Sequence, residues 1–284
     1  MEIKRIAVVG AGAMGTGIAY QAARFGVEVN LTDVKEEYIN NGISKIKGFV
    51  KDGVQRGKLD LKEAKVILDR IHKTPDLEAC VKDVDLVLEA VFEDMKVKQE
   101  LFKKIETFAG PDTIFATNTS SLSITEIAAS TKRPAKVVGV HFFNPAYTMK
   151  LVEIVVGKTT SEETVETATK FAQKLDKTTV RCKDSAGFIV NRILGALMGE
   201  AFKILQEGLA TAEDIDTAMQ LGANHPVGPL TLADYVGLDI ARAVAETLHR
   251  AYGDCYATPK ILVGLVESGK LGMKSGEGFH KYTK

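Results

Sequence analysis

Short apolar runs alternate with amphipathic stretches over the first 185 residues of the chain. Apolar runs bounded by turn residues predict strands, and apolar positions at helical spacing predict the helices between them. The predicted strands cover 6–9, 27–32, 85–90, 113–117, 137–142, 151–156 and 178–182. The predicted helices cover 13–25, 95–109 and 162–175, with a helical hairpin near 36–70 that breaks at Gly57-Lys58. This alternation predicts a Rossmann-type α/β fold, a doubly wound and mostly parallel sheet.

The pattern changes at Asp184-Ser-Ala-Gly187, after which helical spacing dominates. Helices are predicted at 188–207, from the capped start at Thr211, at 234–252 and at 260–268. The sequence therefore predicts two domains, 1–185 with the hairpin as an insertion, and 186–284 as an all-α C-terminal domain.

The first predicted strand runs into three glycines at G-x-G-x-x-G spacing, Gly10, Gly12 and Gly15. In a strand-turn-helix context such glycines allow a tight turn, a close approach to a pyrophosphate and close packing of the helix. Asp33 follows the second strand, about 20 residues on, where a carboxylate accepts hydrogen bonds from the adenosine ribose and repels the 2′-phosphate of NADP. The segment predicts NAD binding by Gly10, Ala11, Gly12, Ala13, Met14, Gly15 and Asp33.

The composition of the chain argues against several classes of binding partner. The 284 residues carry 37 acidic and 37 basic side chains, so no overall charge draws the protein to nucleic acid or to a membrane surface. No secretory signal and no run of about 18 apolar residues is visible. Cys80, Cys182 and Cys255 are widely spaced, which favours reduced thiols in a cytoplasmic protein, and no ligand spacing predicts a metal site.

Polar residues follow the predicted strands at the edge where ligands bind in such sheets. Asn118-Thr-Ser120-Ser121 follows one strand, His141 ends the next, and Glu153 lies in the strand after it. Histidine exchanges protons near neutral pH, and a carboxylate can orient its ring. On these residues alone, a structural histidine and a solvent-facing edge carboxylate remain the alternatives.

Longer motifs favour the catalytic interpretation. Asn118-Thr-Ser-Ser-Leu, His141-Phe-Phe-Asn-Pro145, Met149-Lys-Leu-Val-Glu153 and Gly187-Phe-Ile-Val-Asn191-Arg resemble the L-3-hydroxyacyl-CoA dehydrogenase family. The likeness continues through Gly222-Ala-Asn-His-Pro-Val-Gly-Pro229 and Lys274-Ser-Gly-Glu-Gly-Phe279. It is nearest to short bacterial members that act on 3-hydroxybutyryl-CoA or acetoacetyl-CoA.

The resemblance implies a role for each matching residue. His141 is expected to be the general acid/base, and Glu153 the carboxylate that orients it. Ser120 and Asn191 are expected to hydrogen-bond around the substrate's 3-oxygen, Ser120 also near the nicotinamide. Because Asn191 belongs to the helical domain, we expect a site that both domains complete.

Less specific matches extend the expected site. The resemblance places four further side chains at the cofactor, namely Glu93, Lys98, Asn144 and Lys274. Basic residues of the helical hairpin suit the phosphates of CoA, namely Lys51, Arg56 and Lys58. A solvated surface charge is the alternative for these hairpin residues and equally for Glu93, Lys98 and Lys274. The family also implies a homodimer through the C-terminal domain.

The chain departs from the family pattern at a few positions. Ala186 and Ala196 stand where relatives have proline, and Tyr147-Thr148 replaces a Pro-Val pair. These changes put fine substrate preference and domain rigidity in doubt, while the four expected catalytic residues are intact. The alternatives are a non-catalytic, crystallin-like dinucleotide-binding protein and another β-hydroxyacid dehydrogenase, which would use a catalytic lysine.

Overall fold

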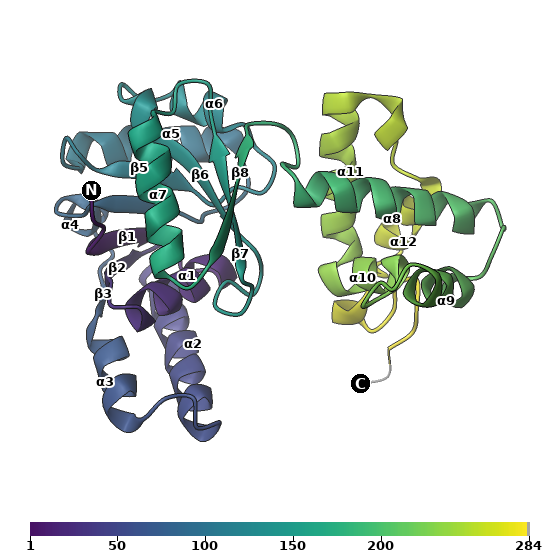
Figure 1. The fold of residues 1–284 in the computed structure, drawn as a ribbon, viewed down its shortest axis with the longest axis horizontal. Helices are drawn as coiled ribbons and strands as arrows, with labels where there is room; N and C mark the ends of the chain where they lie inside the picture. The colour runs from purple at the N-terminus through teal and green to yellow at the C-terminus, as the bar shows by residue number, and fades with distance from the viewer. Residues whose placement is uncertain (283–284) are drawn as a thin grey trace. The chain divides into compact units, whose positions relative to one another are not determined.

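The computed structural model describes residues 1–282, which form two compact units, residues 1–185 and the described residues from Ala186 onward (Figure 1). The first unit contains an eight-stranded sheet in the order β3-β2-β1-β4-β5-β6-β7-β8. Its strands are β1 Arg5–Val9, β2 Glu28–Thr32, β3 Ile71–Lys73, β4 Leu86–Glu89, β5 Ile114–Thr117, β6 Val137–Phe142, β7 Leu151–Val156 and β8 Thr178–Lys183. The second unit is helical, so the predicted fold class is confirmed.

Helices of the first unit pack on this sheet, α1 against β1 and β2, and α7 against β6, β7 and β8. They are α1 Ala13–Arg24, α2 Glu36–Gln55, α3 Leu61–Asp69, α4 Leu77–Val81, α5 Met95–Phe108, α6 Ile124–Ala128 and α7 Glu162–Lys174, with a short 3₁₀ turn η1 Pro134–Lys136. The α2–α3 hairpin points away from the sheet (Figure 1). A reciprocal capping box between Asp60 and Glu63 begins α3, which fixes where the hairpin turns back.

Strand direction changes once within the sheet. Neighbouring strands from β3 to β6 run parallel, β7 runs antiparallel to β6, and β8 runs parallel to β7. Parallel strands covered on both faces are apolar throughout, and β4, β5 and β6 are buried at every residue. The turn between β6 and β7 lies at the carboxyl edge of the parallel strands, where ligands bind in this class of sheet.

The second unit contains α8 Val190–Gln206, α9 Ala212–Gly222, α10 Pro229–Val236, α11 Leu238–Tyr252 and α12 Lys260–Glu267, with the 3₁₀ turns η2 Asp254–Tyr256 and η3 Met273–Ser275. Its core gathers apolar residues of these helices around Phe202, which stacks on Phe279. The prediction of one helix over 234–252 was wrong. Gly237 has φ +102°, outside the helical region, and therefore separates α10 from α11.

Candidate active site

The loop between β1 and α1 depends on glycine for its shape. Gly10 has φ +110°, and a Cβ there would lie 2.5 Å from the carbonyl oxygen of Ala90. A Cβ on Gly15 would lie 1.8 Å from the carbonyl oxygen of Gly10. Ala11 N–H donates to Asp33 Oδ2 (2.7 Å), and Val34 N–H donates to Asp33 Oδ1 (2.7 Å). Asp33 thus joins the glycine loop to the end of β2.

This loop fits a dinucleotide. A Cβ on Gly12 would meet no atom within 4 Å, so protein packing does not require glycine there, whereas close approach of a pyrophosphate does. Helix α1 begins at Gly12 without a side-chain cap and without an acidic residue in its first turn. Its first N–H groups and positive dipole end therefore suit an anion. Val34 (88% exposed) and Phe92 (80% exposed) come just after β2 and β4, and both add exposed apolar surface at the carboxyl edge of the sheet.

His141 and Glu153 lie opposite each other in the antiparallel pair of β6 and β7. His141 Nδ1 is 2.7 Å from Glu153 Oε2, and the two side chains are 6% and 0% exposed. A carboxylate acceptor requires the proton to be on Nδ1, so this contact selects the tautomer and fixes the ring. Phe143 packs against the imidazole, with ring centroids 4.5 Å apart. The His141–Glu153 pair has the geometry of an oriented general acid/base.

The Ser120 loop, residues 118–122 after β5, is held in place by Glu93. Glu93 Oε1 accepts hydrogen bonds from Thr119 Oγ1 (2.6 Å), Ser120 N (2.8 Å) and Ser121 N (3.2 Å). The hydroxyls of Ser120 and Ser121 lie 3.2 and 3.3 Å from the same oxygen. Burial would raise the pKa of Glu93, but the charge of Lys98 and the hydrogen bonds from the loop outweigh it and lower this pKa below its usual value. Glu93 is therefore a carboxylate at neutral pH.

A buried carboxylate that the sequence did not single out lies beneath this loop. Glu89, at the end of β4, is 0% exposed, and its Oε1 accepts Lys98 Nζ at 2.6 Å. Lys98 is itself 1% exposed and lies 3.3 Å from Glu93 Oε2. Cofactor binding by Lys98 stays a prediction, and its ammonium is already bonded to Glu89 and paired with Glu93. A glutamate in an apolar strand was the available signal, because a buried charge needs a partner.

The hairpin residues expected at CoA do not all lie together. Arg56 and Lys58 line a cavity of about 400 Å³ in the first unit, whereas Lys51 is exposed and does not line it. Phe49 and Tyr147 pack against each other in the cavity wall, with tilted rings whose centroids are 4.4 Å apart. Basic and aromatic side chains in one cavity suit a phosphorylated heterocycle.

Asn144, the remaining cofactor candidate of the first unit, is exposed just after β6, and a cis peptide bond joins it to Pro145. In the second unit, Asn191 lies in the first turn of α8, partly buried. Lys274 Nζ donates to both carboxylate oxygens of Asp239, at 2.5 and 2.6 Å. The roles expected for these three residues stay predictions.

The second unit also holds two buried carboxylates. Asp216 accepts Leu230 N, Thr231 N and the ring of His280. Asp234 accepts Phe279 N (3.0 Å), His280 N (2.9 Å) and Tyr282 OH (3.0 Å). Asp216 thus joins α9 to α10 through backbone amides and to the C-terminal segment through the His280 ring, whereas Asp234 joins α10 to that segment mainly through backbone amides.

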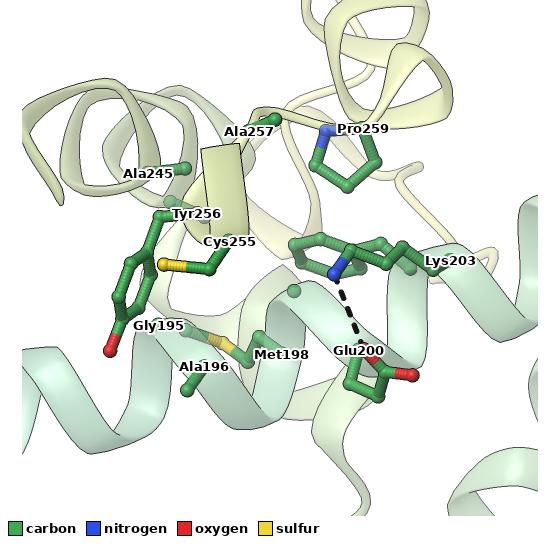
Figure 2. A pocket seen from close by; sticks show the side chains of 13 residues that line it. Gly195, Ala196, Met198, Glu200, Lys203, Ala245, Cys255, Tyr256, Ala257 and Pro259 are labelled. Carbon is green, nitrogen blue, oxygen red and sulfur yellow. Dashed lines mark hydrogen bonds and ion pairs between the residues drawn. The ribbon is translucent and has the colours of Figure 1, made fainter. Parts of the chain in front are cut away.

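A cavity of about 260 Å³ lies between α8 and the α11–η2 region of the second unit. Figure 2 shows Met198, Cys255 and Tyr256 around it, with an ion pair between Lys203 and Glu200 beside them. None of the expected catalytic or cofactor residues lines this cavity.

Two further findings concern residues 1–282 only. No group of three or more His, Cys, Asp or Glu side chains there could hold a metal ion. No helix among them is long and apolar enough to cross a membrane.

The fold and the site together define a class, the NAD-dependent dehydrogenases with a Rossmann-type domain and a helical second domain. Residues 5–185 match the model for the 3-hydroxyacyl-CoA dehydrogenase NAD-binding domain, and residues 187–282 match the C-terminal domain of the same family. The chain belongs to the 3-hydroxyacyl-CoA dehydrogenase family.

Similar proteins span the whole chain. A probable 3-hydroxybutyryl-CoA dehydrogenase of Bacillus subtilis is 45% identical, over 100% of this chain and 99% of its own length. A 3-hydroxybutyryl-CoA dehydrogenase of Clostridioides difficile is 42% identical, over 99% of this chain and all of its own. The crystal structure of (S)-3-hydroxybutyryl-CoA dehydrogenase PaaH1 from Ralstonia eutropha has 38% identity and a TM-score of 0.96, covering 100% of both chains.

Proposed function

We propose that the protein interconverts (S)-3-hydroxybutyryl-CoA and acetoacetyl-CoA with NAD(H). The observation that carries this proposal is the buried hydrogen bond between His141 Nδ1 and Glu153, at the sheet edge that also bears the glycine loop. The names of the relatives, similar over their whole length, support the choice of substrate.

The proton chemistry falls to His141. Because Nδ1 donates to Glu153, exchange with the substrate takes place at Nε2. In oxidation, Nε2 takes the proton of the 3-hydroxyl while C3 loses a hydride, and the imidazolium that forms is stabilised by Glu153. In reduction, Nε2 returns a proton to the developing alkoxide. NAD, when bound, would supply the acceptor for the hydride that leaves C3 in oxidation, and NADH would supply the hydride in reduction.

Ser120 and Asn191 are proposed to hydrogen-bond the 3-oxygen of the substrate. Glu93 supports this role of Ser120, because it holds the loop through the Ser120 backbone N–H. Asn191 carries a neutral amide, whose N–H can donate to the 3-oxygen of either the hydroxy or the keto substrate. Both side chains would stabilise the charge that develops on this oxygen.

For the cofactor we propose NAD rather than NADP, held at Gly10–Gly15 with Asp33 at the adenosine ribose. Asp33 lies at the end of β2 with its carboxylate against the glycine loop, where it would repel a 2′-phosphate. Four more side chains are proposed to complete this cofactor site, namely Glu93, Lys98, Asn144 and Lys274.

The phosphates of CoA are assigned to the basic residues of the hairpin. Arg56 and Lys58 support this assignment because they line one cavity with the Phe49–Tyr147 pair. Lys51, exposed on α2, would add charge from outside that cavity.

We further propose a homodimer through the second unit, in the cytoplasm. Ile193, Leu209 and Leu221 expose 63, 74 and 83% of their surface there, and a second copy would cover exposed apolar side chains of this kind. Gel filtration at micromolar concentration would give a monomer if this is wrong. The three unpaired cysteines fit a reducing compartment, and burial raises the pKa of Cys80 to about 12.

The decisive experiment follows NADH consumption by the purified protein with acetoacetyl-CoA and with a truncated acetoacetyl thioester that lacks the nucleotide part of CoA. We expect turnover of both, with a higher KM for the truncated thioester because it lacks the phosphates. A protein that binds NADH but consumes none with either substrate would instead be a non-catalytic dinucleotide-binding protein.

A further inference from the structure

Glu89 and Lys98 form an ion pair that the fold buries completely. Glu89 Oε1 accepts Val91 N (2.7 Å) and Lys98 Nζ (2.6 Å), and its Oε2 accepts Thr117 Oγ1 (2.7 Å). Removing two charges from water costs free energy that their attraction does not reliably restore, and apolar replacements are often neutral or stabilising. Stability alone therefore does not explain the pair.

The fold does not need charge to join these strands. At the amino ends of β4 and β5 the connection is neutral, because Thr113 Oγ1 donates to the carbonyl oxygen of Val84 at 2.8 Å. At the carboxyl ends, Thr117 donates instead to an ionised group. The charged pair thus lies at the end of the strands that faces the candidate active site.

The ammonium of Lys98 serves a second carboxylate. It lies 3.3 Å from Glu93 Oε2, while Glu93 Oε1 accepts the backbone N–H groups of Ser120 and Ser121. The ammonium of Lys98 is therefore shared by two carboxylates, Glu89 at the end of β4 and Glu93 next to the Ser120 loop. A continuous series of contacts leads from the core of the sheet to Ser120.

We propose that Glu89 and Lys98 are positioning residues for the Ser120 loop and act through Glu93. Glu89 fixes the ammonium, the ammonium keeps Glu93 ionised and oriented, and Glu93 holds the Ser120 and Ser121 amides. The pair sets the place from which Ser120 contacts a substrate. The kinetic part of the test rests on the proposed dehydrogenase function, whereas the structural part does not.

The structural test uses hydrogen exchange of the protein without cofactor. The double variant Glu89→Gln with Lys98→Met removes both charges, so neither is left buried without its partner. We expect the peptide that contains residues 118–122 to exchange roughly tenfold faster, because the hydrogen bonds of its amides to a charged acceptor weaken. Thr113→Val is the matched control, since it removes a buried hydroxyl from the other end of β5 and leaves this peptide unchanged.

The kinetic test uses acetoacetyl-CoA reduction by NADH. In this direction, protonation of Glu93 limits the rate at low pH. Without Lys98, the pKa of Glu93 rises, and the low-pH limit moves to higher pH. We expect kcat to fall by as much as about 10²-fold, the loss that misplacement of a reacting group by about 1 Å causes, with a smaller change in KM for acetoacetyl-CoA.

If Glu89 and Lys98 had only a structural role, the two tests would give a different result. The double variant would then keep wild-type exchange in residues 118–122 and a wild-type pH profile, and that outcome overturns the proposal. If the protein reduces no acetoacetyl-CoA at all, the proposed function fails, and the exchange experiment still decides the role of the pair. Circular dichroism confirms that each variant is folded before either measurement.

Discussion

Both units bury carboxylates, and the partners of Glu153 and Glu89 in the first unit differ from those of Asp234 in the second. In the first unit, Glu153 and Glu89 are bonded to the side chains of His141 and Lys98. In the second unit, Asp234 accepts two backbone amides and a tyrosine hydroxyl. A backbone amide keeps its proton at any working pH. Because Glu153 and Asp234 are equally buried, the different roles that we propose for these two carboxylates come from their partners and not from burial.

The largest effect is expected at Glu153. Glu153→Gln keeps the shape and still accepts the Nδ1 proton of His141, but it cannot stabilise an imidazolium. We expect kcat for acetoacetyl-CoA reduction to fall by about 10³-fold, within the range that general acid/base catalysis contributes, with little change in melting temperature. Steady-state kinetics and circular dichroism on the same preparation measure both. A kcat within a few-fold of wild type would remove Glu153 from the mechanism.

Asp234 should show the opposite pattern. Asp234→Asn replaces a charged acceptor of three hydrogen bonds, and one amide hydrogen would then face a donor. We expect a loss of about 3 kcal/mol in the free energy of unfolding, with kcat of the folded protein close to wild type. Because the chain has no tryptophan, urea unfolding is best followed by circular dichroism. Equal stability, or a loss of kcat comparable to that of Glu153→Gln, would break the comparison.

Asp33 has a structural role and a proposed role in cofactor binding, and we expect its replacement to have the smallest effect of the three. Its carboxylate accepts Ala11 N and Val34 N, and we place the adenosine ribose against it. We expect Asp33→Ser to raise the ratio of kcat/KM for NADPH to that for NADH by about tenfold, roughly 1.4 kcal/mol, because repulsion of the 2′-phosphate is lost.

Asp85 offers a matched control for this prediction. Its carboxylate also accepts two backbone amides, Lys4 N (2.7 Å) and Arg5 N (2.9 Å), but at the amino end of β1. Asp85→Ser should lower stability and leave the cofactor ratio unchanged. If both variants leave the ratio unchanged, Asp33 has only its structural role.

The sequence predicted the parts of the fold that local patterns encode. Apolar runs located seven of the eight strands, and the glycine spacing located the turn before α1. Strand β3, three residues long, was missed because Ile71-His-Lys has only one apolar residue. The break at Gly237 was missed because the apolar spacing continues through it, so only the backbone geometry shows the interruption.

The candidate site was predicted unevenly for a similar reason. His141 and Glu153 were paired through motif resemblance, and the structure shows their hydrogen bond. Glu89 carries no motif that the sequence analysis used, and its partner Lys98 comes nine positions later on another element. Such a pair becomes visible only when the chain is folded, because contacts between a strand end and a helix have no fixed spacing.

The reversal of direction between β6 and β7 has a consequence for how this protein can change. His141 and Glu153 face each other because of strand register, which the ladder of backbone hydrogen bonds maintains. The segment 146–150, which follows Phe143, Asn144 and Pro145 in the connection between the two strands, can therefore vary in sequence while the pair stays in place. Two departures from the family, Tyr147 and Thr148, fall in this segment. Evolution and engineering thus have a region where substrate preference can be altered independently of the chemistry.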